Sequence, residues 1–301
     1  MSAIKEHRSD DLSRLLKKND RGRCYECSFL ATQRGGNVTV KRFTVAWMSL
    51  IILGSVCVGM SDAAIDSETA EVLLLFDDGS GAVAKDASGN GNDAEVSGAQ
   101  WVDGPFGTAL EYDGVDDNVV ITGYLGIGGI EPRTTVFWFQ SKDAREHSWV
   151  KWGPNVTGEK YYIRAHLDGA NCYLRVEVAG GQNYGDTNVC DGEWHHLAVV
   201  FPDGSDSVQD HDLYVDGTLE PKTGGDQVMD TNIADQEVNM GDFLEHHSFM
   251  FGSFDEVGIF NAALTEADIN MIMTQGLAEI STSVEPEDKL AITWGALKSR
   301  F

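Results

Sequence analysis

Lysine and arginine are scarce in this chain of 301 residues. They number 22 against 48 aspartates and glutamates, which gives a formal net charge of −26 at pH 7. The shortage is concentrated after residue 63, where 12 basic residues stand against 42 acidic ones. A body with this charge repels the phosphates of nucleic acids, so we exclude nucleic acid as a partner. The acidic side chains either attract cations or simply keep the surface solvated.

Proline is also rare, with 6 residues against 33 glycines, and aromatic residues make up 9 % of the chain. This composition does not match a disordered chain, and it is typical of short strands joined by many turns. The chain is long enough for one large β-sandwich or for two ordinary domains.

Catalytic motifs are missing as well. We find no convincing Gly-x-Ser-x-Gly, P-loop or dinucleotide-binding pattern. A glycoside hydrolase needs two carboxylates that flank the scissile bond, and on one strand such a pair occupies alternate positions. The acidic pairs Asp116–Asp117 and Asp255–Glu256 are adjacent, so we expect their side chains to point to opposite faces. We therefore expect a non-catalytic protein and keep a glycoside hydrolase as the less favoured alternative.

The five cysteines and eight histidines form no complete zinc site in the sequence. Cys24 and Cys27 make one C-x-x-C pair without a second, whereas a structural zinc ion needs four ligands. His195–His196 and His246–His247 are adjacent pairs, so on strands their rings face opposite sides and cannot chelate one ion.

An apolar run from Phe43 to Met60 follows two basic residues and precedes small residues around Ala63. This order is typical of a secretory signal peptide, so we expect a signal helix within residues 40–63 that is removed on export. An uncleaved membrane anchor is the alternative, because about 18 apolar residues just suffice to span a bilayer. Residues 1–39 are polar and mixed in charge, and we expect them to be an untranslated or disordered extension.

The segment Asp191–Gly217 has the clearest β-hairpin pattern. An Asp-Gly turn opens the run WHHLAVVF, an acidic loop follows, and LYVDG gives the second strand. Both faces of WHHLAVVF are largely apolar, so we expect this strand to be covered on both sides.

Two further strands alternate between apolar and polar positions and should each bury one face. The same period of two predicts which side chains share their outer faces. These are Tyr162, Arg164 and His166 on one strand, and Tyr173, Arg175 and Glu177 on the next.

Three blocks of sequence resemble the motifs of one family, both in their residues and in their order along the chain. The first contains VLLLFDDGSG, DASGNGND and FGTALEYDGVDDNV, the second is the WHHLAVVF and LYVDG hairpin, and the third is FDEVGIFNAALTEADI. Together they resemble the laminin-G-like jelly-roll domain of the concanavalin A-like lectin/glucanase superfamily, over about residues 71–277. The resemblance implies an all-β fold, a two-sheet antiparallel jelly-roll sandwich. A short C-terminal helix follows, with Thr265 as its expected N-cap. We place this domain at residues 64–280 and a linker and tail at residues 281–301.

Cys172 and Cys190 flank two expected strands and a Gly180–Gly181 turn. If the hairpin is symmetric about Gly181, the two cysteines face each other directly, close enough to form a disulfide. Export would preserve the bond. We therefore predict a Cys172–Cys190 disulfide, with two buried thiols as the alternative.

Calcium is the cofactor that best fits the acidic loops, because it binds several oxygen ligands. The loop DASGNGND offers Asp86, Asn90, Asn92 and Asp93 on a glycine-rich backbone. The resemblance implies that the first and last strands are neighbours, which would bring Asp255 near this loop. The alternative is that such Asx-Gly loops form hydrogen bonds to their own backbone.

Aromatic side chains in or near expected loops are the candidates for sugar binding. An aromatic face stacks on a sugar ring, while polar neighbours bind the hydroxyl groups. The candidate residues are Trp149, Trp152, Tyr184, Phe243, His246 and His247. The alternative is that the tryptophans belong to the core.

The resemblance and the missing catalytic motifs predict an exported, non-catalytic binding module, assisted by calcium. Its expected partners are glycans or other extracellular surface ligands, including proteins. Its expected location is secreted, periplasmic or at the cell surface. The leading alternative is a structural or adhesive module that is tethered to the membrane by residues 43–60.

Overall fold

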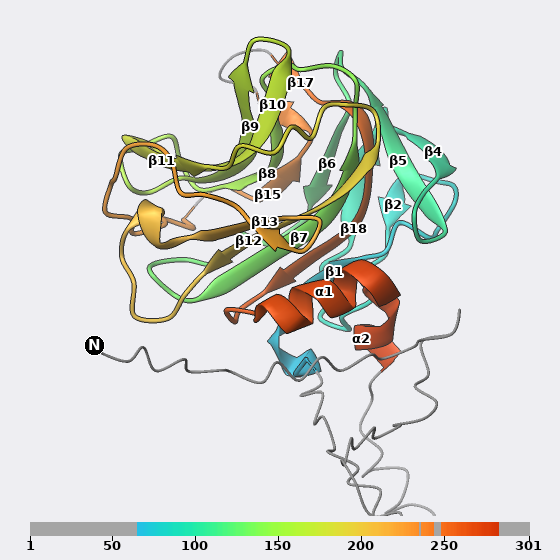
Figure 1. The fold of residues 1–301 in the computed structure, drawn as a ribbon. Helices are drawn as coiled ribbons and strands as arrows, with labels where there is room; N and C mark the ends of the chain where they lie inside the picture. The colour runs from blue at the N-terminus through green and yellow to red at the C-terminus, as the bar shows by residue number, and fades with distance from the viewer. Residues whose placement is uncertain (1–64, 235, 244–247, 283–301) are drawn as a thin grey trace, which may run out of the picture. The chain divides into compact units, whose positions relative to one another are not determined.

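The structure is a computed structural model, and it describes residues 65–234, 236–243 and 248–282. Two antiparallel sheets of eight strands each pack face to face (Figure 1). The predicted all-β, two-sheet sandwich is therefore confirmed. The predicted signal at residues 40–63, the extension at residues 1–39 and most of the tail lie outside the described residues.

The first sheet has the strand order β14-β13-β12-β7-β18-β5-β4, and β1 also pairs with β18. The first and last strands of the sandwich are thus neighbours, as the resemblance implied, with Val72 opposite Ile259. The strands of this sheet are β1 (Ala70–Leu74), β4 (Gln100–Asp103), β5 (Thr108–Asp113), β7 (Arg133–Gln140), β12 (Trp194–Phe201), β13 (Asp212–Val215), β14 (Thr218–Leu219) and β18 (Phe251–Phe260).

The second sheet has the order β11-β10-β9-β8-β15-β6-β3-β2. Its strands are β2 (Val83–Ala84), β3 (Ala94–Ser97), β6 (Asn118–Ile121), β8 (Ser148–Trp152), β9 (Tyr161–Asp168), β10 (Asn171–Val178), β11 (Gly181–Tyr184) and β15 (Val238–Met240). A separate small pair is formed by β16 (Asp242–Phe243) and β17 (Ser248–Phe249).

The main core lies between the two sheets and is built from the inward positions of alternating strands. Phe137 and Phe139 of β7 contribute from the first sheet, and Leu174 and Val176 of β10 contribute from the second. All four side chains are 0 % exposed. Burial of this kind of apolar surface is the main stabilising contribution to such a fold.

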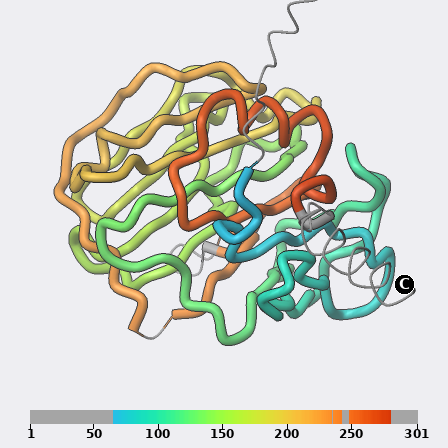
Figure 2. The backbone as a smooth tube through the Cα atoms, turned by 90° about the horizontal axis from the view of Figure 1, so that it is seen from below, coloured from blue at the N-terminus to red at the C-terminus, as the bar shows by residue number. Residues whose placement is uncertain are grey.

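A second core lies on the outer face of the first sheet, where α1 (Glu266–Gln275) and α2 (Ala278–Thr282) pack near the start of β1 (Figure 2). Thr265 caps α1 through a reciprocal pair of bonds with Asp268, as the sequence predicts. Ala198 of β12 belongs to this second core, whereas Leu197 belongs to the main core, so β12 is covered on both sides. Within the described ranges, no helix is long and apolar enough to cross a membrane.

The predicted disulfide is confirmed, but not for the predicted reason. Cys172 and Cys190 are bonded, with Cα atoms 5.6 Å apart. The hairpin pairs Val178 with Gly181, so it turns earlier than a hairpin centred on Gly181 would. Pairing ends at Tyr184, and Cys190 reaches Cys172 from the loop that follows β11. The amide of Val189 donates to the carbonyl of Cys172 at 2.9 Å, which holds that loop against β10.

Candidate functional site

The outer face of β9, β10 and β11 carries polar and aromatic side chains on an otherwise apolar framework. Along β10, Leu174 and Val176 are fully buried, whereas Tyr173, Arg175 and Glu177 are half-buried. This is the alternation that the sequence predicts for this strand. We call the outward side chains of these three strands the polar–aromatic face; they are Tyr162, Arg164, His166, Tyr173, Arg175, Glu177, Gln182 and Tyr184.

Three rings form a row across this face. His166 of β9 stacks on Tyr184 of β11, with ring centroids 3.8 Å apart and planes inclined by 18°. Tyr173 of β10 lies on the same row, with its ring centroid 6.3 Å from that of His166 and planes inclined by 26°. Tyr173 and Tyr184 are half-buried, so each ring keeps an accessible part that could contact a sugar ring.

Glu177 is the centre of the charged part of the face. It accepts from Lys160 at 2.5 Å, from Arg164 at 3.1 Å and from Arg175. Burial by itself would raise the pKa of Glu177, but the hydrogen bond from Lys160 and the three positive charges lower the pKa below its ordinary value. Glu177 is therefore ionised, and it fixes three long cationic side chains beside the aromatic row.

An open cavity of about 270 Å³ lies at the end of the β10–β11 hairpin. It is lined by Arg175, Glu177, Gly180, Gly181, Gln182 and Gly225. The amide of Gln182 donates to the carbonyl of Gly225 at 2.8 Å, so the segment around Gly225 runs along β11. A Cβ atom on Gly181 would lie only 2.8 Å from the backbone nitrogen of Gln227, which explains why glycine is needed there.

The structure places one of the predicted sugar-binding residues, Tyr184, on the polar–aromatic face. Sequence patterns put His166 and Tyr173 on the outer face of a strand but do not single them out for binding. The sequence feature that could have identified them is an aromatic residue at an outward position, where an alternating strand otherwise has polar residues. The side chain of Phe243 is not described, and His246 and His247 lie outside the described residues.

The prediction that Trp149 and Trp152 bind sugar is wrong, and the alternative that these tryptophans belong to the core is confirmed. Both belong to β8 and are buried in the main core, with 0 % and 1 % of their surface exposed. Trp149 contacts Phe137 and Phe139, whose ring centroids lie 5.8 and 5.2 Å from its own. A ring with this packing has no free face for a ligand.

The predicted calcium loop forms hydrogen bonds to its own backbone and to β1. The carboxylate of Asp86 accepts from the amides of Leu73, Ser88 and Asn92 at 2.9–3.0 Å and from the Ser88 hydroxyl at 2.7 Å. Asp93 accepts from the amide of Asp86 and pairs with Lys85 at 2.5 Å. In this arrangement the Asp86 oxygens face hydrogen-bond donors, and this geometry does not fit a cation. Calcium binding at the loop stays a prediction.

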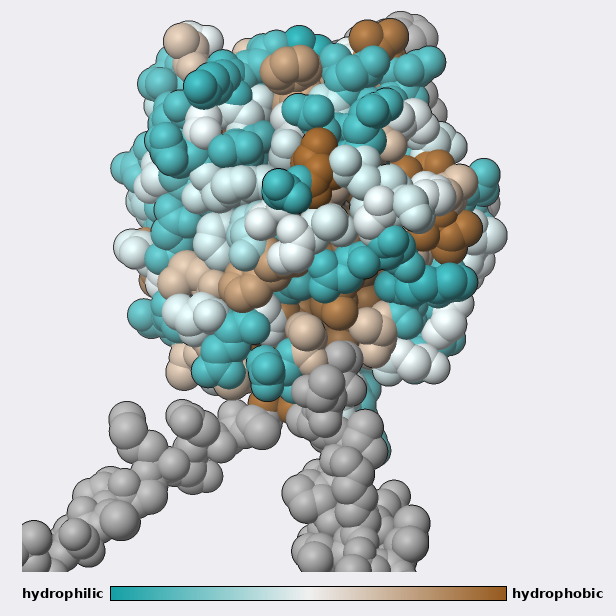
Figure 3. Space-filling view, turned by 90° about the vertical axis from the view of Figure 1, so that its right-hand side faces the viewer, coloured by the Kyte–Doolittle hydropathy of each residue, from teal (hydrophilic) through white to brown (hydrophobic). Residues whose placement is uncertain are grey.

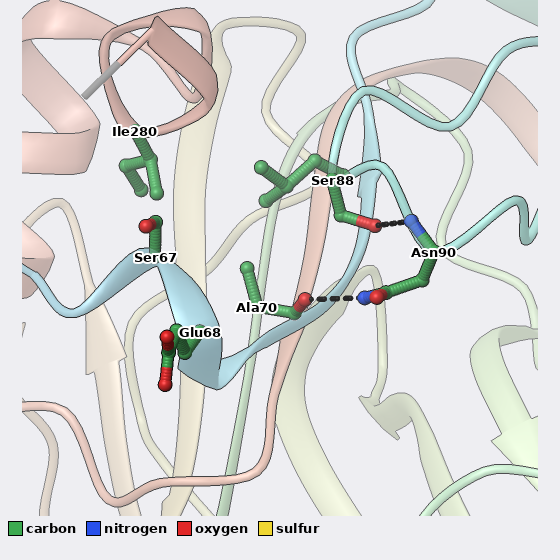
Figure 4. A pocket seen from close by; sticks show the side chains of 7 residues that line it. Ser67, Glu68, Ala70, Ser88, Asn90 and Ile280 are labelled. Atoms are coloured by element: carbon green, nitrogen blue, oxygen red, sulfur yellow. Dashed lines mark hydrogen bonds between the residues drawn. The ribbon is translucent and has the colours of Figure 1, made fainter. Parts of the chain in front are cut away.

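The side-chain amides of this loop also face carbonyl groups. Asn90 donates to the carbonyl of Ala70 at 2.8 Å, and Asn92 donates to that of Glu71 at the same distance. A second cavity of about 270 Å³ lies beside them, between the loop, the start of β1 and α2 (Figure 4). Its lining is Ser67, Glu68, Ala70, Leu73, Ser88, Asn90 and Ile280.

Asp255 lies beside the turn around Phe106 and not beside the predicted calcium loop at residues 86–93. It is fully buried in β18, and its carboxylate lies 3.4 Å from the amide of Phe106. A bulge follows, in which Glu256 has φ 54° and its carboxylate accepts from the amide of Leu277. Both carboxylates therefore lie near the Phe106 turn, which corrects the expectation that they face opposite sides.

Burial raises the pKa values of this acidic pair. It is the largest cause for both, and the pKa is about 8 for Asp255 and about 7 for Glu256. Neither residue lines the two cavities described above. Both carboxyls are buried, at 0 % and 2 % exposure, whereas the pair of a glycoside hydrolase must reach the substrate that it flanks.

One acidic cluster was not predicted from the sequence. Asp113, Asp116 and Asp117 each bring a carboxylate oxygen within 4.8 Å of the others. Asp117 already accepts from the amide of Asp113 at 2.7 Å, and Asp113 accepts from that of Val115 at 2.8 Å. The cluster is a tight turn that is held by its own backbone.

Hydrophilic residues spread over much of the surface in the view of Figure 3, with small apolar groups between them.

A family model described as concanavalin A-like lectin/glucanases superfamily matches residues 113–270. The chain belongs to this superfamily, as the three sequence blocks predicted. A comparison with curated proteins found no match.

Several solved structures share the fold. Domain 4 of AbnA, a GH43 extracellular arabinanase from Geobacillus stearothermophilus, is 15 % identical, with a TM-score of 0.53. The match covers 68 % of this chain and 98 % of that domain. The binding domain of Paraclostridial Mosquitocidal Protein 1 is 15 % identical, with a TM-score of 0.52 and coverages of 69 % and 52 %.

The binding domain of botulinum neurotoxin serotype G is 12 % identical, with a TM-score of 0.50 and coverages of 68 % and 50 %. The chain thus spans nearly all of the arabinanase domain but about half of each toxin binding domain. At these identities the likeness shows the fold.

Proposed function

We propose that this protein is an exported, non-catalytic carbohydrate-binding module whose ligand lies on the polar–aromatic face. The observation that carries the proposal is the row of Tyr173, His166 and Tyr184 beside the charged group around Glu177. A sugar needs a flat apolar surface for its ring and polar groups for its hydroxyls, and this face offers both within three neighbouring strands.

The similar folds support binding as the general role. The arabinanase domain was solved in complex with arabinotriose, and the other two similar structures are named as binding domains. Fold similarity does not specify the ligand, so the choice of a carbohydrate rests on the polar–aromatic face.

The absence of catalysis is proposed from the placement of the carboxyl groups. Asp255 and Glu256 are the acidic pair with strongly raised pKa values, yet they are 0 % and 2 % exposed. The Phe106 turn and the segment around Leu277 lie over them and separate them from a substrate. Export is proposed because the Cys172–Cys190 disulfide fits an oxidising compartment.

A glycan array probed with the purified protein tests the proposal, once with calcium and once with a chelator. We expect binding to at least one class of glycan. Binding that is lost on chelation would support calcium assistance, and binding that survives would remove calcium from the binding step. If the folded protein binds no glycan under either condition, the result would contradict the proposal and favour the structural or adhesive alternative.

Two variants locate the site on the molecule. Tyr184→Ala removes one ring of the row, and we expect a loss of affinity of about tenfold, which is at the lower end of the range for bases that stack on aromatic side chains. Phe251→Ala is the matched control, because Phe251 is a 41 % exposed aromatic residue on the other sheet. Equal losses in the two variants, or none in Tyr184→Ala, would place the ligand elsewhere.

A further inference from the structure

We propose, on the basis of the proposed function, that the ligand is an acidic sugar. Its carboxylate or sulfate group would be bound by Arg175 at the cavity of the β10–β11 hairpin. The sugar ring would lie on the neighbouring aromatic row. Two features of the described residues support this assignment: the location of the basic side chains and an unpaired donor on Arg175.

The basic residues of this acidic protein gather on one sheet face. The described residues contain nine lysines and arginines. Four of them belong to the outer face of the second sheet: Lys151, Lys160, Arg164 and Arg175. Lys151 and Lys160 both lie over the ring of Tyr162, at 5.6 and 4.6 Å from its centroid, which places them on the same side as the two arginines. Lys151 contacts Asp242, and the other three contact Glu177. An acidic ligand would therefore meet the largest group of cations among the described residues on this face.

Arg175 is the cation that a ligand in the cavity would meet. Its side chain lines the cavity together with Glu177 and Gln182. One terminal nitrogen donates to Glu177, while the buried Nε has no hydrogen-bond partner. A guanidinium group binds carboxylates and sulfates through two parallel N–H bonds, and a buried donor without a partner is unfavourable.

The aromatic row lies within one sugar residue of this donor. Arg175 is directly opposite Tyr184 in the β10–β11 pairing, and Tyr173 is two positions away on the same strand and face. Residues that are paired across antiparallel strands have Cα atoms about 5 Å apart, and residues two apart along a strand are separated by about 7 Å. A stacked pyranose ring with an acidic substituent spans such a distance.

Binding of matched charged and neutral ligands tests the assignment. By calorimetry we would compare oligogalacturonate with its methyl ester, and dextran sulfate with dextran. We expect the native protein to bind at least one charged member about tenfold more tightly than its neutral partner, the gain expected from one charge-assisted hydrogen bond. A preference in the first pair identifies a carboxylate ligand, and a preference in the second identifies a sulfate.

The variant Arg175→Gln should reduce the preference for the charged member to less than about twofold. Lys85→Gln is the matched control, because Lys85 is an exposed cation next to β2, at the opposite edge of the second sheet. It should retain the preference of the native protein. If Arg175→Gln does not fold, the binding of the charged and neutral ligands to the native protein still tests whether the ligand is acidic.

The outcomes separate the two proposals. Equal binding of charged and neutral members, with loss of both in Tyr184→Ala, would overturn the acidic-sugar inference and keep the carbohydrate-binding function. An equal preference in Arg175→Gln and in the native protein would also overturn the inference. Absence of binding to all four ligands would overturn the inference, and only silence on the full glycan array would overturn the proposed function.

Discussion

His166 stacks on Tyr184 across the intervening strand β10, with ring centroids 3.8 Å apart. The contact joins β9 to β11 on the outer face of the second sheet and buries part of the imidazole. Burial is the largest cause of a lowered His166 pKa, followed by the charge of Arg175. At neutral pH the ring is therefore uncharged.

The first prediction concerns this contact. Tyr184→Ala exposes the imidazole, so the pKa of His166 should rise toward its ordinary value of 6.5. An NMR titration of the histidine side chains measures it. The control Phe251→Ala should leave the His166 titration unchanged. A His166 titration that is the same in Tyr184→Ala and in the native protein would show that the stack does not bury the ring in solution.

The second prediction concerns the acidic pair in β18. Because burial raises the pKa of Asp255 to about 8, the folded protein retains a proton that the unfolded chain releases near pH 4. Folding stability should therefore fall as the pH rises from about 4 to about 8. Asp255→Asn removes this contribution, so its Tm should exceed that of the native protein at pH 8 and the gap should narrow toward pH 5.

Circular dichroism melting between pH 5 and pH 9 measures this effect. Asp203→Asn is the control, since Asp203 is exposed and lies outside the acidic clusters described above. A Tm difference between Asp255→Asn and the native protein that is constant over this range would contradict the raised pKa.

The third prediction concerns the His195 bridge in the first sheet. Both ring nitrogens of His195 face carboxylates, Asp216 at 2.8 Å and Asp191 at 3.1 Å. The hydrogen bond to Asp216 is the largest cause that raises the His195 pKa above 6.5. The stabilisation by the charged ring is fully present below pH 6.5 and is lost as the pH rises through the raised value.

His195→Gln should therefore lower the Tm more at pH 6 than at pH 9. Thermal melting at the two pH values, with the native protein measured in parallel, provides the comparison. A larger effect at pH 9 would mean that the neutral ring, through packing, carries most of the stabilisation.

The fourth prediction concerns the disulfide. Cys172 and Cys190 are 18 residues apart in sequence, and closing a loop of this size stabilises the folded state by about 3 kcal/mol. The double variant Cys172→Ser with Cys190→Ser should lose about this amount in urea unfolding. Reduction of the native protein should produce a similar loss, and a reduced protein as stable as the oxidised one would contradict the estimate.

The fifth prediction concerns calcium. Since the Asp86 carboxylate already accepts four hydrogen bonds from protein groups, removal of calcium should change the Tm by less than about one degree. Differential scanning calorimetry with calcium and with a chelator measures this. A large loss on chelation would show that the loop rearranges around an ion, as the sequence-based calcium prediction requires.

Much of the fold was predictable because local patterns specify it. Alternation along β10 separates Leu174 and Val176 from Arg175 and Glu177, and a strand cannot place these on one side. Likewise, Thr265 and Asp268 form a capping box whose spacing is sufficient to start α1. Such features depend on neighbours within a few residues, so they can be read in order along the chain.

The site depended on contacts that the chain order does not reveal. Trp149 and Trp152 of β8 have the aromatic rings that a sugar-binding surface needs, but packing between the two sheets buries both of them. The bulge after Asp255 brings two adjacent carboxylates near one turn, which a regular period of two excludes. Only the pairing of β9, β10 and β11 places His166, Arg175 and Tyr184 together. The sequence alone thus determined which side chains face outward on each strand. The sheet register and the packing of the two layers decided which of them meet, because those contacts join residues that are far apart in the chain.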